Sequence, residues 1–405
     1  MSSQPNILTG LKVLDLTRAL AGPSCTRMFA EMGADVIKVE AGPGGDMVRG
    51  MSKIGNERSL YLVQQSLNKK SVCVDFHNPE GLALVKELVA HVDVVVENYK
   101  PGVMANMGMS YEELKKIKSD IIMCSISALG QTGPLSSKPG YDYIAQAYSG
   151  VTSMIGDPNE APYIPCVGLG DISTGVTASV GVLAALRYRD QTGKGQHVDI
   201  GLLDVYYQYH EVNVHQASAS KGAIKPTRTG RHVSYVAPAG VFQGNDGCAM
   251  IMGFLHHWKD LCASMERPDL LDHEIYGNDA KRLEHRDEVI EIIETWLKGF
   301  PSVHDAVAKM EEHGVPCAPI LTVEETINHP HFRERGTVRT VDDPIAGKFD
   351  MPGHPIRFSD FPDDPGYVAP TLGQHNQEVL SEVLGKSKEE IDALASNGVL
   401  IEGPN

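Results

Sequence analysis

The stretch LKVLDLTRALAGPSCTRMFAEMGADVIKVE, residues 11–40, contains a complete folding unit. Its apolar start, 11–16, and its apolar end, 34–40, each predict a β-strand, and the segment between them predicts a short helix that stops at Gly33. A strand, a helix and a strand in this order form a βαβ unit. The turn after the first strand, 17–20, then lies where helix N-terminal amides can meet a phosphate.

The same order recurs over the first 204 residues. Asn78 and Pro79 predict the start of one helix, and a Ser110–Glu113 capping box predicts the start of another. A further helix begins near Asp171. Further strands are predicted at 70–76, 92–98, 120–127 and 197–203. Strands that alternate with helices over this length predict the α/β class, with a doubly wound, Rossmann-like sheet.

The pattern changes after Leu203. One long helix is predicted over 203–220, a hairpin turns at 245–247, and residues 326–368, dense in Pro, Asp and Gly, predict an extended return segment. Further helices are predicted at 255–266, 284–299, 302–313, 374–384 and 388–396, the last with a Ser387–Glu390 capping box. The predicted parts are 1–204, the first part of the large domain; 205–230, a linker; 231–325, a small α+β domain; 326–368, a return linker; and 369–405, C-terminal helices that complete the large domain.

Composition limits the function classes. The chain carries 36 Lys and Arg against 52 Asp and Glu, a formal net charge of -16, which argues against a nucleic-acid-binding or anionic-membrane surface. Its seven cysteines form no Cys-x-x-Cys pair, so we expect buried thiols and no metal site. The first ten residues do not resemble a secretory signal, and the longest apolar run, 175–186, is too short to span a bilayer. We expect a soluble, cytoplasmic protein.

Common catalytic and cofactor motifs are absent from the sequence. The first βα turn lacks Gly-x-Gly-x-x-Gly and is not a P-loop, so Glu40, at the end of the second strand, does not by itself indicate a nicotinamide cofactor. Neither His-Glu-x-x-His nor Gly-x-Ser-x-Gly occurs, which leaves a metalloprotease or a serine hydrolase without support.

A carboxylate near the front, Asp171, interrupts the apolar stretch VGLGDISTGVTASVGVLAALRYRD, residues 167–190. Asp is a favoured helix N-cap, worth about 1 kcal/mol, and that role alone would explain it. Gly168 and Gly170 also predict a backbone that a ligand or another chain can approach closely, which would suit a nucleophile. Burial would raise the pKa of Asp171 and helix amides would lower it, so the sequence leaves the direction open.

Several segments together resemble the class III CoA-transferases (CaiB/BaiF type), a family that includes formyl-CoA:oxalate and carnitine CoA-transferases. Weaker similarity at 313–325 and 372–385 extends the resemblance over nearly the whole chain. The main segments occur in the family's order and are 11–50, NKKSVCVDF (68–76), VVENYKPGVMANMG (95–108), ALGQTGP (128–134), GYDYIAQAYSG (140–150), GLGDISTG (168–175) and TGKGQHVDIGLLD (192–204).

The resemblance implies an enzyme of the EC 2.8.3 type that moves CoA from an acyl-CoA thioester to a free carboxylic acid. The aspartate of the Gly-Asp step, here Asp171, would attack the thioester to give a mixed anhydride, and the released CoA thiolate would convert this into an aspartyl-CoA thioester. The acceptor acid then opens that thioester and receives CoA. The thioester is a substrate, and no separate cofactor is implied. The resemblance also implies an interlaced homodimer, in which long linkers let each chain form an open ring linked through that of its partner.

The resemblance further implies CoA contacts, residue by residue. Some members of the family carry Arg where this chain has Ala41, and many carry Arg where it has Asn106, so phosphate contacts would pass to Arg18, Lys69 or Lys70. The resemblance places Arg18, Ala19, Leu20 and Ala21 in the first loop, Val74 and His77 beside the adenine, and Lys138 and Tyr141 in the loop that faces the thioester. Asn98, Tyr99 and Lys100 would contact the nucleotide or the pantetheine arm, and Asn106 completes the expected CoA-binding set.

Two alternatives differ in their chemistry. The first is an α-methylacyl-CoA racemase of the same superfamily, or a related acyl-CoA isomerase, which needs a group that transfers a proton. Racemases carry a His for this proton transfer where this chain has Tyr141. A phenol with a pKa of about 10 suits the proton transfer poorly. A non-catalytic CoA-binding protein would not need the carboxylate of Asp171. Arg228 and Arg231 are candidate partners for a second substrate carboxylate, which favours a short dicarboxylate such as succinate, or they are solvated linker charges.

Overall fold

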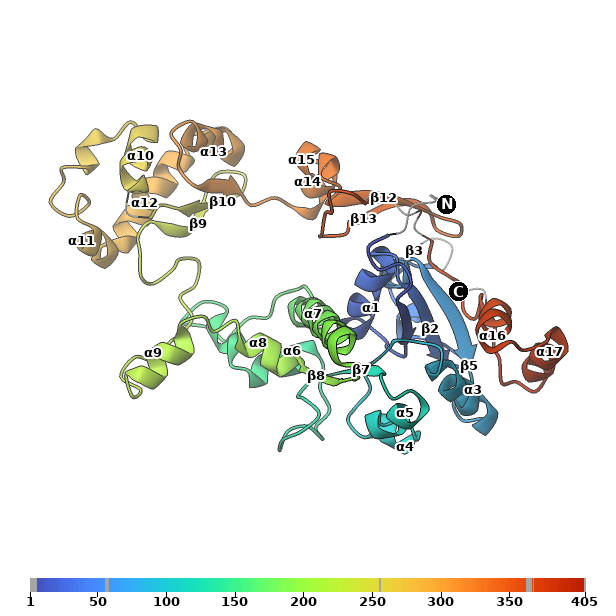
Figure 1. Ribbon diagram of the computed structural model, residues 1–405. Coiled ribbons are helices and arrows are strands. Elements are labelled where there is room, and N and C mark those ends of the chain that lie inside the picture. The colour runs from blue at the N-terminus through green and yellow to red at the C-terminus, as the bar shows by residue number, and fades with distance from the viewer. Residues whose placement is uncertain (1–5, 55–57, 255, 362–365, 367, 404–405) are drawn as a thin grey trace. The chain divides into compact units, whose positions relative to one another are not determined.

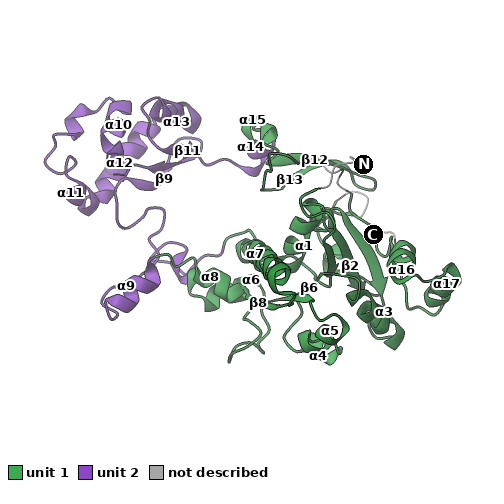
Figure 2. Cartoon of the chain, viewed as in Figure 1, with its two compact units in different colours: residues 1–151, 165–211, 329–405 green, residues 152–164, 212–328 purple. Residues whose placement is uncertain are grey.

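The computed structural model describes residues 6–54, 58–254, 256–361, 366 and 368–403 (Figure 1). These form two compact units, each discontinuous in sequence: unit 1 spans 1–151, 165–211 and 329–405, and unit 2 spans 152–164 and 212–328 (Figure 2). Residue 255, where one predicted helix begins, and residues 362–365 and 367, within the predicted return linker, lie outside the described residues.

Unit 1 contains a six-stranded parallel sheet, which confirms the predicted α/β class. Its strand order is β5-β2-β1-β6-β7-β8. Because β2 lies on one side of β1 and β6 on the other, the winding reverses between β1 and β6, which is the switch point of a doubly wound sheet. The strands are β1 (Lys12–Asp15), β2 (Asp35–Ala41), β5 (Lys69–Val74), β6 (Val94–Glu97), β7 (Ile122–Ser127) and β8 (His197–Gly201).

Helices cover both faces of this sheet because successive strand residues point to opposite sides. On β1, Val13 packs with α1 and α7, whereas Leu14 packs with α3, α16 and α17 (Figure 1). The helices of unit 1 are α1 (Ala21–Glu31), α2 (Leu60–Ser66), α3 (Pro79–Val89), α4 (Val103–Asn106), α5 (Tyr111–Ile117), α6 (Asp142–Tyr148), α7 (Leu169–Thr192), α8 (Leu202–Tyr207), α15 (Pro330–Glu334), α16 (Asn376–Leu384) and α17 (Lys388–Ser396). Both predicted capping boxes are present, at the starts of α5 and α17.

Unit 2 contains a three-stranded antiparallel sheet, ordered β11-β10-β9, whose core packs against three helices. The turn at 244–247 joins β9 to β10, which confirms the predicted hairpin. The elements are α9 (Asn213–Ala219), β9 (Ala239–Gln243), β10 (Cys248–Met252), α10 (His257–Ser264), α11 (Asp279–Glu284), α12 (Arg286–Leu297), α13 (Val303–Glu311), β11 (Cys317–Pro319) and α14 (Val323–Asn328).

Predictions for the two linkers are wrong in detail. The helix expected over 203–220 is interrupted after Tyr207, because the next amides bond back over only three residues and the helical pattern ends there. The return segment expected to be extended contains α15 and an antiparallel pair, β12 (Val338–Asp343) and β13 (Gly347–Pro352). Its Asp, Pro and Gly residues form the turn of that pair. A second short pair joins β3 (Lys53–Ile54) to β4 (Arg58–Ser59).

Helix α7 is longer than its apolar run indicated. It has 24 residues and is the one helix among the described residues that is long and apolar enough to cross a membrane by length and composition, with 39% of its most apolar window buried. The predicted run of 175–186 is thus part of a longer helix, and one such helix is weak evidence for a membrane span. Gly175 packs against α1, where an added Cβ would lie 2.7 Å from Ser24 Cβ. The opposite face is exposed, so the helix is not buried all round.

The predicted burial of all cysteines is also wrong. Cys166 is exposed, and Cys248 and Cys317 are partly exposed.

Candidate functional site

A cavity of about 530 Å³ opens in unit 1 at the carboxyl ends of β1, β6 and β7. This position is the switch point, where open α/β sheets bind their ligands. Three turns that are far apart in sequence form its wall, together with the start of α7. Of the predicted site residues, those that line it are Arg18, Ala19, Leu20, Ala21, Asn98, Tyr99, Lys100, Lys138, Tyr141 and Asp171.

Asp171 lies in the first turn of α7 and is not its N-cap. The helix begins at Leu169 with Gly168 at the N-cap position, and no side chain of that residue caps it. The backbone N–H of Asp171 instead donates to Oδ2 of Asp142, over 3.2 Å. The prediction that Asp171 caps the helix is therefore wrong, because a different carboxylate occupies the helix start.

Burial and the neighbouring charge of Asp142 raise the pKa of Asp171 to about 7. This settles the direction that the sequence left open: the cost of removing the carboxylate from water exceeds any benefit from helix amides. A carboxylate with a raised pKa is more basic when it is ionised, and near neutral pH a large fraction of it is ionised. Such a group is suited to attack an electrophile.

The glycines beside Asp171 admit other parts of the same chain. A Cβ at Gly168 would lie 2.7 Å from Cδ2 of Leu20, and one at Gly170 would lie 2.2 Å from Cε2 of Tyr206. The prediction of an open approach past these glycines is wrong, because those two side chains fill the space. Access to Asp171 is from the cavity.

Side chains from other strands hold the turn after β1 in place. The backbone N–H of Arg18 donates to Oδ1 of Asn98 over 2.9 Å, and Nδ2 of Asn98 donates back to the Arg18 carbonyl over 2.8 Å. Ala19 has a φ of 64°, which a non-glycine residue rarely adopts, and its N–H donates to Asp46. Asp46 in turn accepts from the buried Nζ of Lys38 over 3.0 Å. The turn therefore presents a fixed backbone to the cavity.

The expected transfer of phosphate contacts to Lys69 or Lys70 does not fit the structure. Lys69 is buried and its Nζ lies 2.9 Å from Oδ2 of Asp15, while Lys70 pairs with Asp35 and Glu378. The cations that line the cavity are Arg18, Lys100 and Lys138. These three are exposed and accessible to an anionic ligand.

Three predicted CoA contacts do not line the cavity. Val74 is buried in the core at the end of β5, and His77 and Asn106 are exposed elsewhere on unit 1. Glu40 is buried and forms a two-bond ion pair with Arg49, over 2.7 and 2.6 Å, so its role is structural.

In unit 2, the guanidinium of Arg228 donates to the carbonyls of Asp157, Ser153 and Glu160, which commits it to holding loops together. Arg231 is half exposed and pairs with Glu294 over 3.3 Å.

Three functional candidates were missed from the sequence: Tyr61, Asp142 and Tyr206. Burial and the charges of Asp171 and Asp46 raise the pKa of Tyr61 to about 12, which keeps it a neutral phenol close to both carboxylates. Asp142 could have been noted because it follows Tyr141 in a segment already assigned to the site. Tyr61 and Tyr206 carry no local signal, since only the folded chain brings them to Asp171.

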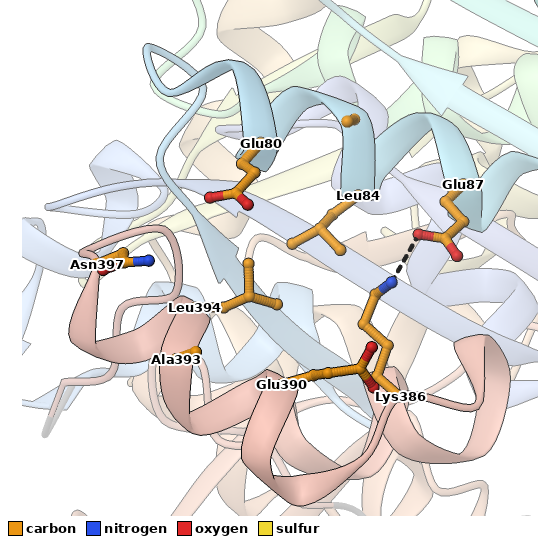
Figure 3. A pocket seen from close by; sticks show the side chains of 9 residues that line it. Glu80, Leu84, Glu87, Lys386, Glu390, Ala393, Leu394 and Asn397 are labelled. Atoms are coloured by element: carbon orange, nitrogen blue, oxygen red, sulfur yellow. Dashed lines mark ion pairs between the residues drawn. The ribbon is translucent and has the colours of Figure 1, made fainter.

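A second cavity, of about 350 Å³, lies between α3 and α17 (Figure 3). An ion pair of 3.0 Å between Lys386 and Glu87 crosses one end of it, and none of the predicted site residues lines it. No group of three or more His, Cys, Asp or Glu residues suited to hold a metal occurs within the described ranges.

The sequence model of CoA-transferase family III matches residues 8–376. The chain belongs to CoA-transferase family III. Succinyl-CoA--D-citramalate CoA-transferase from Chloroflexus aurantiacus is 34% identical, covering 99% of this chain and 100% of that protein. Human succinyl-CoA:glutarate CoA-transferase is 35% identical, and the match covers 97% of this chain and 90% of that protein. The crystal structure of a CAIB/BAIF family protein from Brucella suis has a TM-score of 0.84 and 33% identity, covering 94% of this chain and 100% of that one.

These matches confirm the predicted family and enzyme class. This family III protein is a CoA-transferase of the EC 2.8.3 type, and its relatives act on CoA thioesters of carboxylic acids. In this CoA-transferase the cavity, its three cations and Asp171 occupy one end of the sheet.

Proposed function

We propose that the protein transfers CoA from an acyl-CoA thioester to a free carboxylic acid with Asp171 as the nucleophile. The observation that carries the proposal is the position of Asp171. It lies on the wall of the switch-point cavity, at a helix start, with a pKa raised to about 7. The resemblance of the Gly-Asp step to that of the family supports the same residue.

The reaction balances without a net proton transfer. An oxygen of ionised Asp171 attacks the thioester carbonyl carbon, the C–S bond breaks, and CoA leaves as a thiolate beside an aspartyl mixed anhydride. The thiolate attacks the Asp171 carbonyl carbon, which releases the donor acid and leaves an aspartyl-CoA thioester. The acceptor carboxylate displaces CoA again, and the thiolate then takes the acceptor acyl group and frees Asp171. An aspartate suits this exchange because each intermediate stays about as reactive as a thioester.

The cations of the cavity suit CoA as the ligand. Arg18 lies 5.3 Å from the ring of Tyr99, and Nζ of Lys138 donates to the Tyr148 hydroxyl, so both cations are held near the opening. We assign Arg18, Lys100 and Lys138 to the phosphates of CoA and the apolar wall to its pantetheine arm. CoA enters as a substrate, and the mechanism uses no further cofactor.

We propose succinyl-CoA as the donor and a short dicarboxylic acid as the acceptor. Two relatives of nearly equal length are named for succinyl-CoA, and both of their acceptors, citramalate and glutarate, are dicarboxylic acids.

We further propose a soluble, cytoplasmic homodimer of interlaced chains. The exposed face of α7 carries a continuous apolar stripe at helical spacing: Ile172, Val176, Val180 and Leu183. An apolar stripe of this kind needs a cover, and a second copy of the chain supplies one. Val180→Asp should convert dimers into monomers in light scattering at fixed concentration, and Asp190→Ala on the same helix should not. A dimeric Val180→Asp variant would contradict this assignment.

The nucleophile is tested by trapping. The protein is incubated with succinyl-CoA, treated with hydroxylamine, and its peptides are weighed by mass spectrometry. We expect an aspartyl adduct on the peptide that contains Asp171, and loss of adduct and of transfer in Asp171→Ala. Transfer by Asp171→Ala at the wild-type rate would refute the assignment. A panel of mono- and dicarboxylic acids, assayed by the appearance of new CoA esters, then identifies the acceptor.

A further inference from the structure

Helix α7 starts without a cap of its own. The first N–H groups of any helix lack intrahelical acceptors and need partners from elsewhere. Here the N-cap position is a glycine, which has no side chain to accept from them. An aspartate in the first turn would ordinarily take this role, and Asp171 is the acid in that turn.

Two residues from other helices supply the missing acceptors. The N–H of Gly170 donates to the hydroxyl oxygen of Tyr206, on α8, over 3.0 Å. The N–H of Asp171 donates to Oδ2 of Asp142, on α6, over 3.2 Å. Tyr206 is completely buried and Asp142 is 8% exposed, so water does not compete strongly for either hydrogen bond.

The hydrogen bonds of Tyr206 join these two acceptors into one group. Its hydroxyl accepts from Gly170 and from Nε2 of Gln146, the latter over 3.1 Å, so its own proton is free to point at Asp142. The hydroxyl indeed donates to Oδ1 of Asp142. Burial and the Asp142 contact raise the pKa of Tyr206, which keeps this proton in place. All three hydrogen-bonding sites of the phenol are used.

Glycine at position 170 makes the arrangement sterically possible. A Cβ there would lie 2.2 Å from Cε2 of Tyr206 and 2.5 Å from Oδ1 of Asp142, and both atoms belong to buried groups that have no space to move. The residue before Asp171 is therefore small because the cap from α6 and α8 needs its space.

We propose that Tyr206 is a positioning residue for the reaction: together with Asp142 it caps α7 and so leaves the carboxylate of Asp171 free to face the cavity. This inference rests on the proposed role of Asp171 as the nucleophile. Without the Tyr206 hydroxyl, the N–H of Gly170 loses its acceptor and Oδ1 of Asp142 loses its donor, so the first turn of α7 is no longer fixed. A carboxylate on a loosened helix start is displaced from the thioester.

The test compares Tyr206→Phe, Asp142→Asn and their double variant in steady-state CoA transfer from succinyl-CoA. We expect each single variant to lower kcat by roughly 10- to 100-fold, as a displaced reacting group does, while KM for succinyl-CoA changes by less than about threefold. Because the two residues form one cap, the double variant should be little worse than the poorer single variant. Tyr207→Phe, half exposed on the same helix, is the matched control and should keep wild-type kinetics.

The proposal is overturned if Tyr206→Phe keeps the wild-type kcat, or if its loss is confined to KM or to thermal stability. It is also overturned if the losses of kcat multiply in the double variant, or if Tyr207→Phe loses as much kcat as Tyr206→Phe. If Tyr206→Phe does not fold, Asp142→Asn alone decides by the same kcat criterion. The trapping experiment separates this proposal from the proposed function. If the adduct still requires Asp171 but kcat does not change in Tyr206→Phe, the positioning role of Tyr206 is refuted and the role of Asp171 as nucleophile stands.

Discussion

Replacing Asp171, the proposed nucleophile, should stabilise the protein above pH 4, and the effect should be complete at neutral and higher pH. The pKa of Asp171 is 3.8 in the unfolded chain and about 7 in the folded site. Between these values the folded state holds a proton that the unfolded state has lost, so the free energy of unfolding falls as pH rises through this window. Below pH 4 both states are protonated and nothing is lost, and above pH 7 both are ionised and the loss is complete.

The size of the effect follows from the same two pKa values. Each pH unit between them changes the free energy of unfolding by about 1.4 kcal/mol, so the complete window corresponds to ~4 kcal/mol as an upper value. Because solvent reaches the cavity side of the carboxylate, we expect roughly 2–4 kcal/mol. Asp171→Asn removes the charge at similar shape and should recover this energy at pH 8.

The assay is thermal unfolding of wild type and Asp171→Asn at fixed protein concentration from pH 4.5 to pH 8.5. We expect nearly equal Tm values at the acid end and a variant that is more stable by roughly 4–8 °C at pH 8. Asp190→Asn is the control, since Asp190 lies on the same helix but is exposed. A Tm difference between Asp171→Asn and wild type that does not change with pH would refute the reasoning.

Three further outcomes follow from the structure. The pH profile of kcat/KM should have an acid limb near pH 7, because only ionised Asp171 attacks; a limb near pH 4 would contradict the raised pKa. Arg18→Ala should raise KM for succinyl-CoA about tenfold at nearly constant kcat, measured by initial rates, since Arg18 lines the cavity and pairs with no acid among the described residues; an unchanged KM would remove it from the CoA site. Lys69→Met should lower the free energy of unfolding by roughly 3–5 kcal/mol, because it leaves Asp15 charged, buried and unpaired; a melting temperature equal to wild type would contradict this.

Local pattern was sufficient for much of the fold. Alternating apolar strands, helix caps and glycine stops depend on the residues of one segment and its neighbours, so the parallel sheet, both capping boxes and the hairpin at 244–247 could be predicted. The turns after β1 and β6 were assigned to one site through the resemblance to the class III CoA-transferases. The linkers were less predictable: the helical pattern continues past Tyr207 in the sequence, but the backbone hydrogen bonds of α8 end there.

The sequence by itself determined the family, the sheet and the acid near the start of an apolar helix, because these are properties of order and spacing. Only the tertiary structure decided what that acid experiences. Asp142 binds the N–H of Asp171 from 29 residues away in sequence, Tyr206 binds the N–H of Gly170 from 36 residues away, and together they cap α7. Lys69 cannot contact a ligand phosphate because it is buried in an ion pair with Asp15. Charge and hydrogen bonding act through space, so the raised pKa of Asp171 exists only once the chain has folded.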